Sequence, residues 1–232
     1  MRSIFVNWFI YFEPFLNHDL DESILGLIPS NWRIDNIGNI CDVKGGKRLP
    51  KGINLITEPN SHPYIRVRDM NNSQYLLLND EFEFVDNETQ KTIERYIVSE
   101  GNVIISIVGT IGLISKIHKS LEGANLTENC VKLTNVKQIT TDYLYMWLSS
   151  EYGQQSISQM TVGAVQAKLP IKNIQDIKII IPPGDVIDKF QEFINPITYQ
   201  IQNNLSQNEN MKRMRETLLP KLMSGEVNLD EL

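Results

Sequence analysis

The chain has 232 residues and a mass of 26.7 kDa, enough for one sizeable core with an extension. Its apolar fraction of 41% and charged fraction of 22% are typical of a globular protein, and no apolar stretch approaches the roughly 20 residues of a membrane span, so we expect a cytoplasmic protein without membrane contact. The formal net charge of -6 disfavours a uniformly basic nucleic-acid binder, so any such surface must be a local patch or must rely on a partner for much of its positive charge.

A run of apolar and aromatic residues opens the chain, and we predict a short helix or strand over residues 2–15. Glu13 and Pro14 stand where a signal peptide has small residues, so we interpret the run as packed structure rather than as a signal peptide. Ser30 and Asn31, which follow a proline, predict a turn that leads into the next domain.

Short apolar runs alternate with clusters of Gly, Asn, Asp and Pro from Arg33 to about Ile180. Several of these runs are β-branched, which predicts a mostly β domain with a few helices. The clearest helical insertion covers residues 141–159, where apolar residues fit one helix face. The runs that we predict as strands are Tyr64–Val67, Tyr75–Leu78, Phe82–Val85, Val103–Val108, Leu113–Ile117, Cys130–Leu133 and Ile177–Ile181.

The pattern changes at residues 182–184 (PPG), because prolines cannot continue a central strand and readily precede a helix. Beyond them, a heptad pattern predicts one long helix over residues 186–223 with a single seam. Such a helix would be about 57 Å long, too long to bury itself against a small domain, so we expect it to need a partner helix. The seam consists of two series, Phe190, Ile197, Asn204, Met211 and Leu218, and Ile194, Ile201, Asn208, Arg215 and Leu222.

Two features of this seam bear on how the helix is used. Pro196 lies in its first turns and should kink the helix there. Asn204 and Asn208 form two polar layers, which cost stability but specify the register of a defined pairing.

No motif for catalysis or metal binding is recognisable in the sequence. The three histidines have no ligand-like spacing, and Cys41 and Cys130 are too far apart for a C-x-x-C site, so we expect reduced, buried thiols, no metal and no cofactor. The glycines of residues 45–46 lack the spacing of a phosphate loop, and we interpret residues 109–112 (GTIG) as a tight turn. An enzyme with an unrecognised site stays an alternative.

Basic residues gather instead on one glycine-rich segment. A loop of this composition can bring backbone N–H groups and cationic side chains to a phosphate, although a solvated basic loop is the alternative. The candidate residues are Lys44, Gly45, Gly46, Lys47, Arg48 and Lys51.

Arg66 and Arg68 alternate along a strand-like run, so we predict that both project from one strand face while Ile65 and Val67 face the other. Two guanidinium groups on one face suit bidentate contacts to phosphate or to guanine O6 and N7. The alternative is a pair of surface salt bridges to Asp69 or Asp80.

Several segments together resemble type I restriction-modification specificity subunits, over nearly the whole chain. The segments that resemble their target-recognition domains are residues 45–52 (GGKRLPKG), 62–70 (HPYIRVRDM), 104–112 (IISIVGTIG) and 124–129 (ANLTEN). Those that resemble their helical spacer are residues 181–183 (IPP), the long helix and residues 215–227 (RETLLPKLMSGEV), and residues 8–14 (WFIYFEP) resemble the stretch that links the two halves.

The resemblance implies a non-catalytic subunit that recognises double-stranded DNA and scaffolds methylation subunits, with restriction subunits as further partners. In that family two recognition domains, separated by two antiparallel helices, each read one half of a split site. This chain has one domain and one helix, so we expect a half-length form that pairs with a second copy through an antiparallel coiled coil. Pairing with a different half, and a protein-interaction scaffold that does not bind DNA, stay open as alternatives.

The resemblance also orders the candidate DNA contacts. The glycine-rich basic loop comes first, together with Arg66 and Arg68. Weaker candidates, chosen for polar side chains in apparent loops, are Thr110, Asn125, Thr127 and Gln166.

The sequence as a whole predicts an α+β fold, with a mostly β target-recognition domain and a long C-terminal coiled-coil helix. The predicted boundaries are residues 1–30 for an N-terminal linking segment that packs near the helix, 31–182 for the recognition domain, 183–225 for the spacer and dimerisation helix, and 226–232 for a tail.

Overall fold

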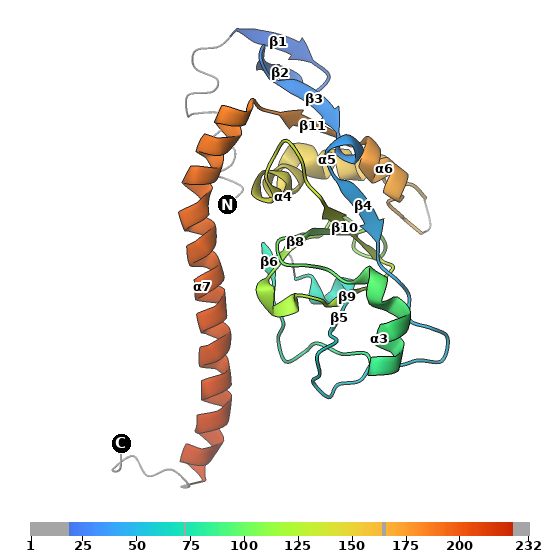
Figure 1. Cartoon of the computed structure of the whole chain (residues 1–232), viewed down its shortest axis with the longest axis vertical. Coiled ribbons are helices and arrows are strands. Elements are labelled where there is room, and N and C mark those ends of the chain that lie inside the picture. Colours follow the sequence, from blue (N-terminus) through green and yellow to red (C-terminus); the bar gives the residue numbers. More distant parts are fainter. Residues whose placement is uncertain (1–18, 72, 164–165, 225–232) are drawn as a thin grey trace. The chain divides into compact units, whose positions relative to one another are not determined.

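A five-stranded mixed sheet organises the first part of the computed structural model, which describes residues 19–71, 73–163 and 166–224 (Figure 1). Neighbouring strands run antiparallel except for the last pair, which is parallel. The central strands are buried on both faces, which explains why they read as continuous apolar runs rather than as alternating ones. In spatial order the strands are β4 (Asp42–Gly45), β10 (Cys130–Thr134), β7 (Val103–Ser106), β8 (Ile114–Ile117) and β6 (Tyr75–Leu76).

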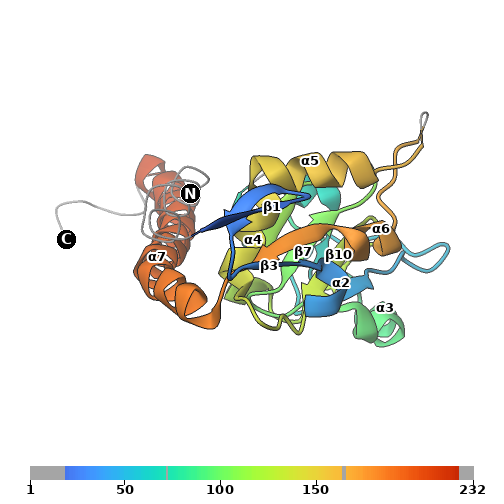
Figure 2. The same cartoon turned by 90° about the horizontal axis from the view of Figure 1, so that it is seen from above.

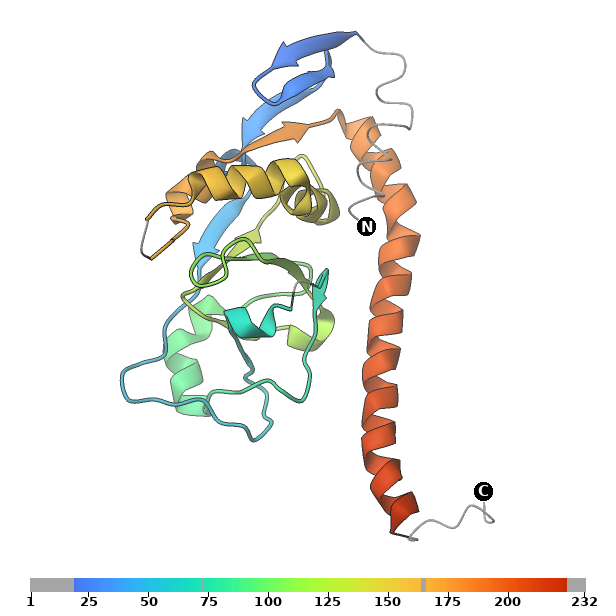
Figure 3. The same ribbon diagram turned by 180° about the vertical axis from the view of Figure 1, so that it is seen from behind.

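One face of the sheet packs against the parallel pair β5 (Tyr64–Ile65) and β9 (Asn125–Leu126). Ile104 and Ile117 from the sheet share one apolar cluster with residues of both short strands. Helix α3 (Asn87–Ile93) lies on this side too (Figures 1 and 3). It begins where Asp86 accepts a hydrogen bond from the Thr89 N–H at 2.7 Å, the usual function of an N-cap aspartate.

Helix α4 (Thr141–Ser149) covers the opposite face and contacts β7 and β8. Helix α5 (Glu151–Met160) follows it after a break at Ser150, so the predicted helical insertion over residues 141–159 is present but divided into two helices. Ser150 is extended, and its hydroxyl accepts a hydrogen bond from the Gly153 N–H at 3.3 Å, as an N-cap serine does. The backbone of Gly153 approaches α4 so closely that a Cβ there would lie 2.2 Å from the Trp147 carbonyl oxygen. Apolar periodicity does not detect a cap inside such a pattern.

Two further antiparallel pairs complete the β structure. β3 (Arg33–Asn36) pairs with β11 (Lys178–Ile181), and the two are seen side by side in Figure 2. β1 (Leu20–Ser23) and β2 (Gly26–Pro29) form a hairpin, after which Ser30 and Asn31 make the predicted turn. The remaining short elements are α2 (Ile37–Ile40), α6 (Ile171–Asp176) and the 3-10 turns η1 (Val67–Asp69), η2 (Glu94–Tyr96) and η3 (Lys119–Leu121).

Most of the predicted strands are present at least in part, with one exception. Phe82–Val85 is not a strand, because Phe84 makes only isolated bridges to Ile56 and Pro63. The prediction for residues 2–15 lies outside the described residues. In the described ranges, no helix combines the length and hydropathy of a membrane span.

Helix α7 (Gly184–Met223) begins directly after the two prolines, as predicted, and stays helical through Pro196. Its first two turns belong to the same compact unit as the sheets, and a second unit begins at Glu192. In the first unit, the ring of Phe190 packs edge-on against Tyr143 of α4 with 5.8 Å between centroids. The Tyr143 hydroxyl donates to the carbonyl oxygen of Ile180 at 2.9 Å, so α4 holds both β11 and the start of α7. Burial raises the pKa of this tyrosine.

Candidate nucleic-acid interface

The glycine-rich segment that follows β4 is held by its own backbone. The Gly46 N–H donates to the Cys130 carbonyl at 3.0 Å, and the Lys47 N–H donates to the Leu126 carbonyl at 2.8 Å. Gly46 passes so close to the neighbouring chain that a Cβ there would lie 2.0 Å from the Thr127 carbonyl oxygen. These two N–H groups are therefore already used and are not available to a phosphate. The glycine serves close backbone packing instead.

The cations of this segment point to different partners rather than to one site. Lys44 forms an ion pair with Asp42 at 2.9 Å, and the Lys47 ammonium lies 5.6 Å from the centre of the Tyr96 ring, in the range of a cation–π contact. Arg48 Nε donates to Glu128 Oε1 at 2.5 Å. Lys51 is exposed. Of this segment, Arg48 is the cation that lines a pocket.

Glu128 fixes the position of the Arg48 side chain. Burial acts to raise the pKa of Glu128, but hydrogen bonds from Arg48, from its own backbone and from Thr127 outweigh burial and hold the pKa below its usual value. The same hydrogen bond raises the pKa of Arg48. The Thr127 hydroxyl completes the arrangement by donating to Glu128 Oε2 at 3.0 Å. Glu128 is thus ionised at neutral pH and neutralises the positive charge of Arg48 at this surface.

Arg66 and Arg68 do not share a strand face, so that prediction is wrong. β5 ends at Ile65, and Asp69 Oδ2 accepts a hydrogen bond from the Arg66 N–H at 2.7 Å, which closes the chain into the 3-10 turn η1. Both guanidinium groups then bind Glu83 Oε2, Arg68 at 2.6 Å. Burial, the largest influence, lowers the pKa of Arg66. The geometry favours the salt-bridge alternative, with Glu83 as the main acid in addition to Asp69.

The structure shows the surroundings of three of the weaker candidates for DNA contact. Thr110 is exposed in the predicted tight turn, where Gly109 and Gly112 both have positive φ. Asn125 and Thr127 are buried, Asn125 in strand β9, where its amide nitrogen donates to Gln90 Oε1 at 2.5 Å. The expectation of a loop is therefore wrong for Asn125, whereas Thr127 does lie in the loop after β9 but is buried there.

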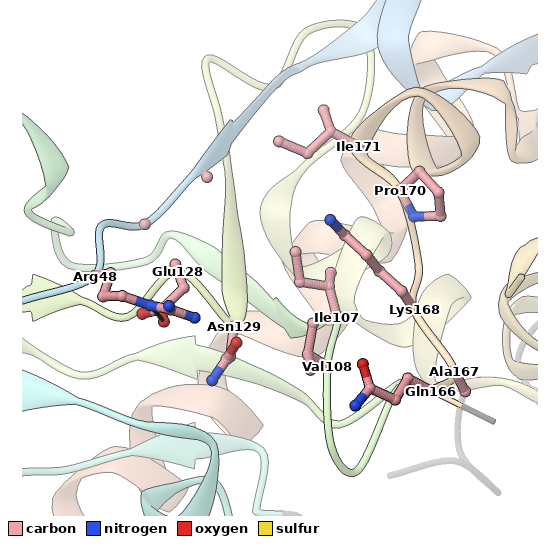
Figure 4. Close-up of a pocket in the computed structure, with 12 residues that line it drawn as sticks. Arg48, Ile107, Val108, Glu128, Asn129, Gln166, Ala167, Lys168, Pro170 and Ile171 are labelled. Carbon is pink, nitrogen blue, oxygen red and sulfur yellow. Dashed lines mark hydrogen bonds and ion pairs between the residues drawn. The ribbon is translucent and has the colours of Figure 1, made fainter. Parts of the chain in front are cut away.

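A pocket of about 650 Å³ brings together four segments that are distant in sequence (Figure 4). The Ile107 N–H donates to the Asn129 carbonyl at 2.8 Å, and the Leu169 N–H donates to the Ile107 carbonyl at 3.0 Å, so backbone bonds hold the segments together. Val108 and Lys168 also form an isolated antiparallel bridge. The lining consists of Gly45, Gly46, Arg48, Ile107, Val108, Glu128, Asn129, Gln166, Ala167, Lys168, Pro170 and Ile171.

The pocket contains four of the predicted residues, Gly45, Gly46, Arg48 and Gln166, and two polar side chains that the sequence reasoning did not single out. These two are Asn129 and Lys168. One signal for Lys168 was available, because it is the only basic residue between Lys137 and Lys172 and stands two residues before Pro170. Asn129 carries no comparable signal.

The lining of the pocket combines polar and apolar side chains. Its polar residues are two carboxamides, one lysine and one ion pair, beside an apolar wall. The thiols of Cys41 and Cys130 are free and buried, as expected, and burial raises the pKa of each to about 12. Among the described residues, no group of three or more His, Cys, Asp or Glu side chains is arranged to hold a metal ion.

The seam residues all lie on α7. Phe190 is buried in the first unit. In the distal part of the helix, Met211, Leu218 and Leu222 are exposed by 57%, 49% and 37%. Three apolar seam side chains of the distal helix are therefore accessible in the described part of the chain.

Known proteins resemble this chain along nearly its whole length. It is 26% identical to the MjaIX specificity subunit, a type I restriction enzyme subunit from Methanocaldococcus jannaschii, over 99% of this chain and 52% of that protein. It is 22% identical to the HindI specificity subunit from Haemophilus influenzae, over 86% and 42%. The chain thus spans about half the length of the curated relatives it matches.

The fold is shared with solved structures. The HsdS subunit from Thermoanaerobacter tengcongensis superposes with a TM-score of 0.55 at 17% identity, over 97% of this chain and 50% of that one. The family described as "Type I restriction modification DNA specificity domain" matches residues 29–211, which include both the sheet domain and most of α7. The chain belongs to this family of type I restriction-modification DNA specificity domains.

Proposed function

We propose that this chain is a half-length DNA specificity subunit, which reads one half of a bipartite site and scaffolds methylation and restriction subunits without catalysis of its own. The observation that carries this proposal is that the chain matches about half of its relatives' length and has one sheet domain followed by one long helix. The chain spans 52% of a curated relative, yet it holds one sheet domain and one 40-residue helix. One such unit would supply one DNA-recognition domain and one spacer helix.

The proposed roles of the segments follow the domain boundaries predicted from the sequence. We assign residues 31–182 to the recognition domain, residues 183–225 to the spacer helix, residues 1–30 to the linking segment and residues 226–232 to the tail. The pocket beside Arg48 and Lys168 is supported as the DNA-facing region because it gathers hydrogen-bonding and cationic side chains from four separate segments. The net charge of -6 fits a subunit whose partners help to hold the DNA backbone.

A second copy of the chain is the proposed partner of the helix. Met211, Leu218 and Leu222 repeat at heptad spacing and are exposed, and Asn204 and Asn208 supply polar layers that fix a register. An antiparallel pair of such helices is two-fold symmetric. The two recognition domains would therefore bind two-fold related DNA half-sites at a fixed separation.

Two measurements on the full chain test the proposal. The first is a selection from random duplexes, with the chain alone and with the methylation subunit from its own genome, at low and high salt. We expect an enriched sequence and an affinity that falls steeply with salt. If no duplex is bound even with the methylation subunit present, the DNA-reading function is wrong and a protein-interaction scaffold replaces it.

The second measurement is the mass in solution by light scattering over a range of concentrations. We expect a dimer that becomes a monomer in Ile201→Asp and Leu218→Asp. Thr217→Asp, which adds the same charge one residue outside the seam, is the matched control and should stay dimeric. A wild-type chain that is monomeric at all concentrations would overturn self-pairing and favour a different partner half.

A further inference from the structure

Two carboxamides in the pocket are available to a ligand. Asn129 is half-buried and Gln166 is exposed, and among the residues that the structure describes neither side chain makes a hydrogen bond. In Figure 4, Val108 is drawn between the two carboxamides. A carboxamide offers one acceptor and two donors in a plane, the pattern that pairs with the N6 and N7 atoms of adenine.

The charged side chains of the same pocket are less suited to reading a base. Arg48, which could pair with guanine, is held by Glu128 at 2.5 Å, and Glu128, which could accept from cytosine N4, is held in turn by Arg48 and Thr127. This arrangement neutralises the charge of Arg48 and occupies its Nε but not its terminal Nη atoms, so the carboxamides are the pocket side chains that offer a donor and an acceptor together. Lys168 remains as a flexible point charge, which suits a phosphate.

An apolar wall lies beside the carboxamides. Ile107 is buried, Val108 is half-buried, and Pro170 and Ile171 continue the wall. In the major groove, the thymine C5-methyl group is the one apolar feature that distinguishes a base pair. A carboxamide next to an accessible valine therefore matches both the adenine and the thymine of one A·T base pair.

We propose that this pocket reads one A·T base pair of the half-site, with Gln166 bound to adenine N6 and N7, Val108 in contact with the thymine methyl group and Lys168 on a neighbouring phosphate. Asn129 is more buried than Gln166 and supplies a second carboxamide to the major-groove edge of the same base pair. The inference rests on the proposed DNA-reading function and adds to it the chemical identity of one base pair.

Modified duplexes test each contact by removing single atoms from the DNA. The selected duplex is prepared with 7-deazaadenine, which lacks N7, or with uracil, which lacks the methyl group, at each A·T position in turn. At one position we expect the full-length protein to lose about fivefold or more in affinity for 7-deazaadenine. For uracil we expect a loss of about three- to fourfold, the value of one buried methyl group.

Variants assign the losses to residues. Gln166→Ala should abolish the 7-deazaadenine penalty at that position, and Val108→Ala should abolish the uracil penalty. Gln155→Ala and Val162→Ala, matched exposed residues outside the pocket lining, should keep both. Lys168→Ala should weaken all duplexes equally and lower the salt slope by about 1.

The outcomes separate the inference from the function on which it rests. Without any enriched sequence, the DNA-reading function fails and the inference fails with it. With an enriched sequence but penalties that survive Gln166→Ala and Val108→Ala, DNA reading stands and the assignment of this pocket to an A·T pair is wrong. Folding of each variant is confirmed by its thermal unfolding curve.

Discussion

Lys116 and Asp142 form a buried ion pair, with Lys116 Nζ 2.5 Å from Asp142 Oδ1 and side-chain exposures of 5% and 10%. The pair joins strand β8 to helix α4. Asp142 Oδ2 also accepts a hydrogen bond from Gln191 at 3.1 Å, in the first turns of α7, and Lys116 donates to the Tyr75 hydroxyl at 3.2 Å. One polar cluster therefore connects two strands of the sheet with α4 and the beginning of the long helix.

We expect Asp142→Ala to lower the free energy of unfolding by about 3–5 kcal/mol, because it leaves the buried Lys116 ammonium without a counter-charge. Urea unfolding measures the loss. The double variant Lys116→Met, Asp142→Leu should regain most of it, since a buried pair is replaceable by apolar side chains of similar size. A single variant as stable as the wild type would contradict the structural importance of the pair.

Gly46→Ala should destabilise the protein by about 2 kcal/mol or more, because the new Cβ would meet the Thr127 carbonyl oxygen at 2.0 Å and neither backbone segment can move freely. Gly184→Ala is the matched control. No atom lies within 4 Å of a Cβ at that first residue of α7, so its effect should be neutral or stabilising by up to about 1 kcal/mol. Equal losses in both variants would contradict the close-packing explanation for Gly46.

The architecture was predictable from the sequence wherever one residue type has one strong structural consequence. The two prolines before Gly184 located the start of α7, and the β-branched run within Val103–Ser106 located a central strand. Glycines also marked the tight turn of residues 109–112. These signals are local and are not altered by tertiary contacts.

The site was predictable only in part, because its details depend on partners distant in sequence. Arg66 and Arg68 both bind Glu83, which no spacing rule connects to them. Asn125 looks like a loop residue in the sequence but lies buried in β9. Asn129 and Lys168 meet in one pocket only because backbone bonds join their segments through Ile107. The type of a side chain alone does not predict which residues distant in sequence it will contact.

Cys41 and Cys130 should resist thiol reagents in the native state at neutral pH. Both are buried, and burial raises the pKa of each to about 12, so almost no thiolate is present to react. Titration with Ellman's reagent should find both thiols only after denaturation in urea. Rapid reaction of one thiol in the folded protein would show that its surroundings open in solution.

Glu128→Gln should release Arg48 and remove one negative charge from the pocket, on the proposal that this surface faces DNA. We expect tighter binding to unrelated duplexes and a salt slope steeper by about 1, because one more cation becomes available to a phosphate. Fluorescence anisotropy over a salt series measures both. Arg68→Gln, which removes a cation outside the pocket lining, is the control and should not steepen the slope.

The same carboxylate gives a pH dependence with a defined sign. The pKa of Glu128 is lower in the folded protein than its ordinary value, so its ionised form stabilises the fold at pH values above that ordinary pKa, about 4.3. This contribution is lost as the pH falls through the lower, folded pKa. We therefore expect Glu128→Gln to be less stable than the wild type at neutral pH and the two to converge on acidification. A difference in urea midpoint that stays constant from neutral to acidic pH would show that the ionised Glu128–Arg48 pair does not stabilise the fold.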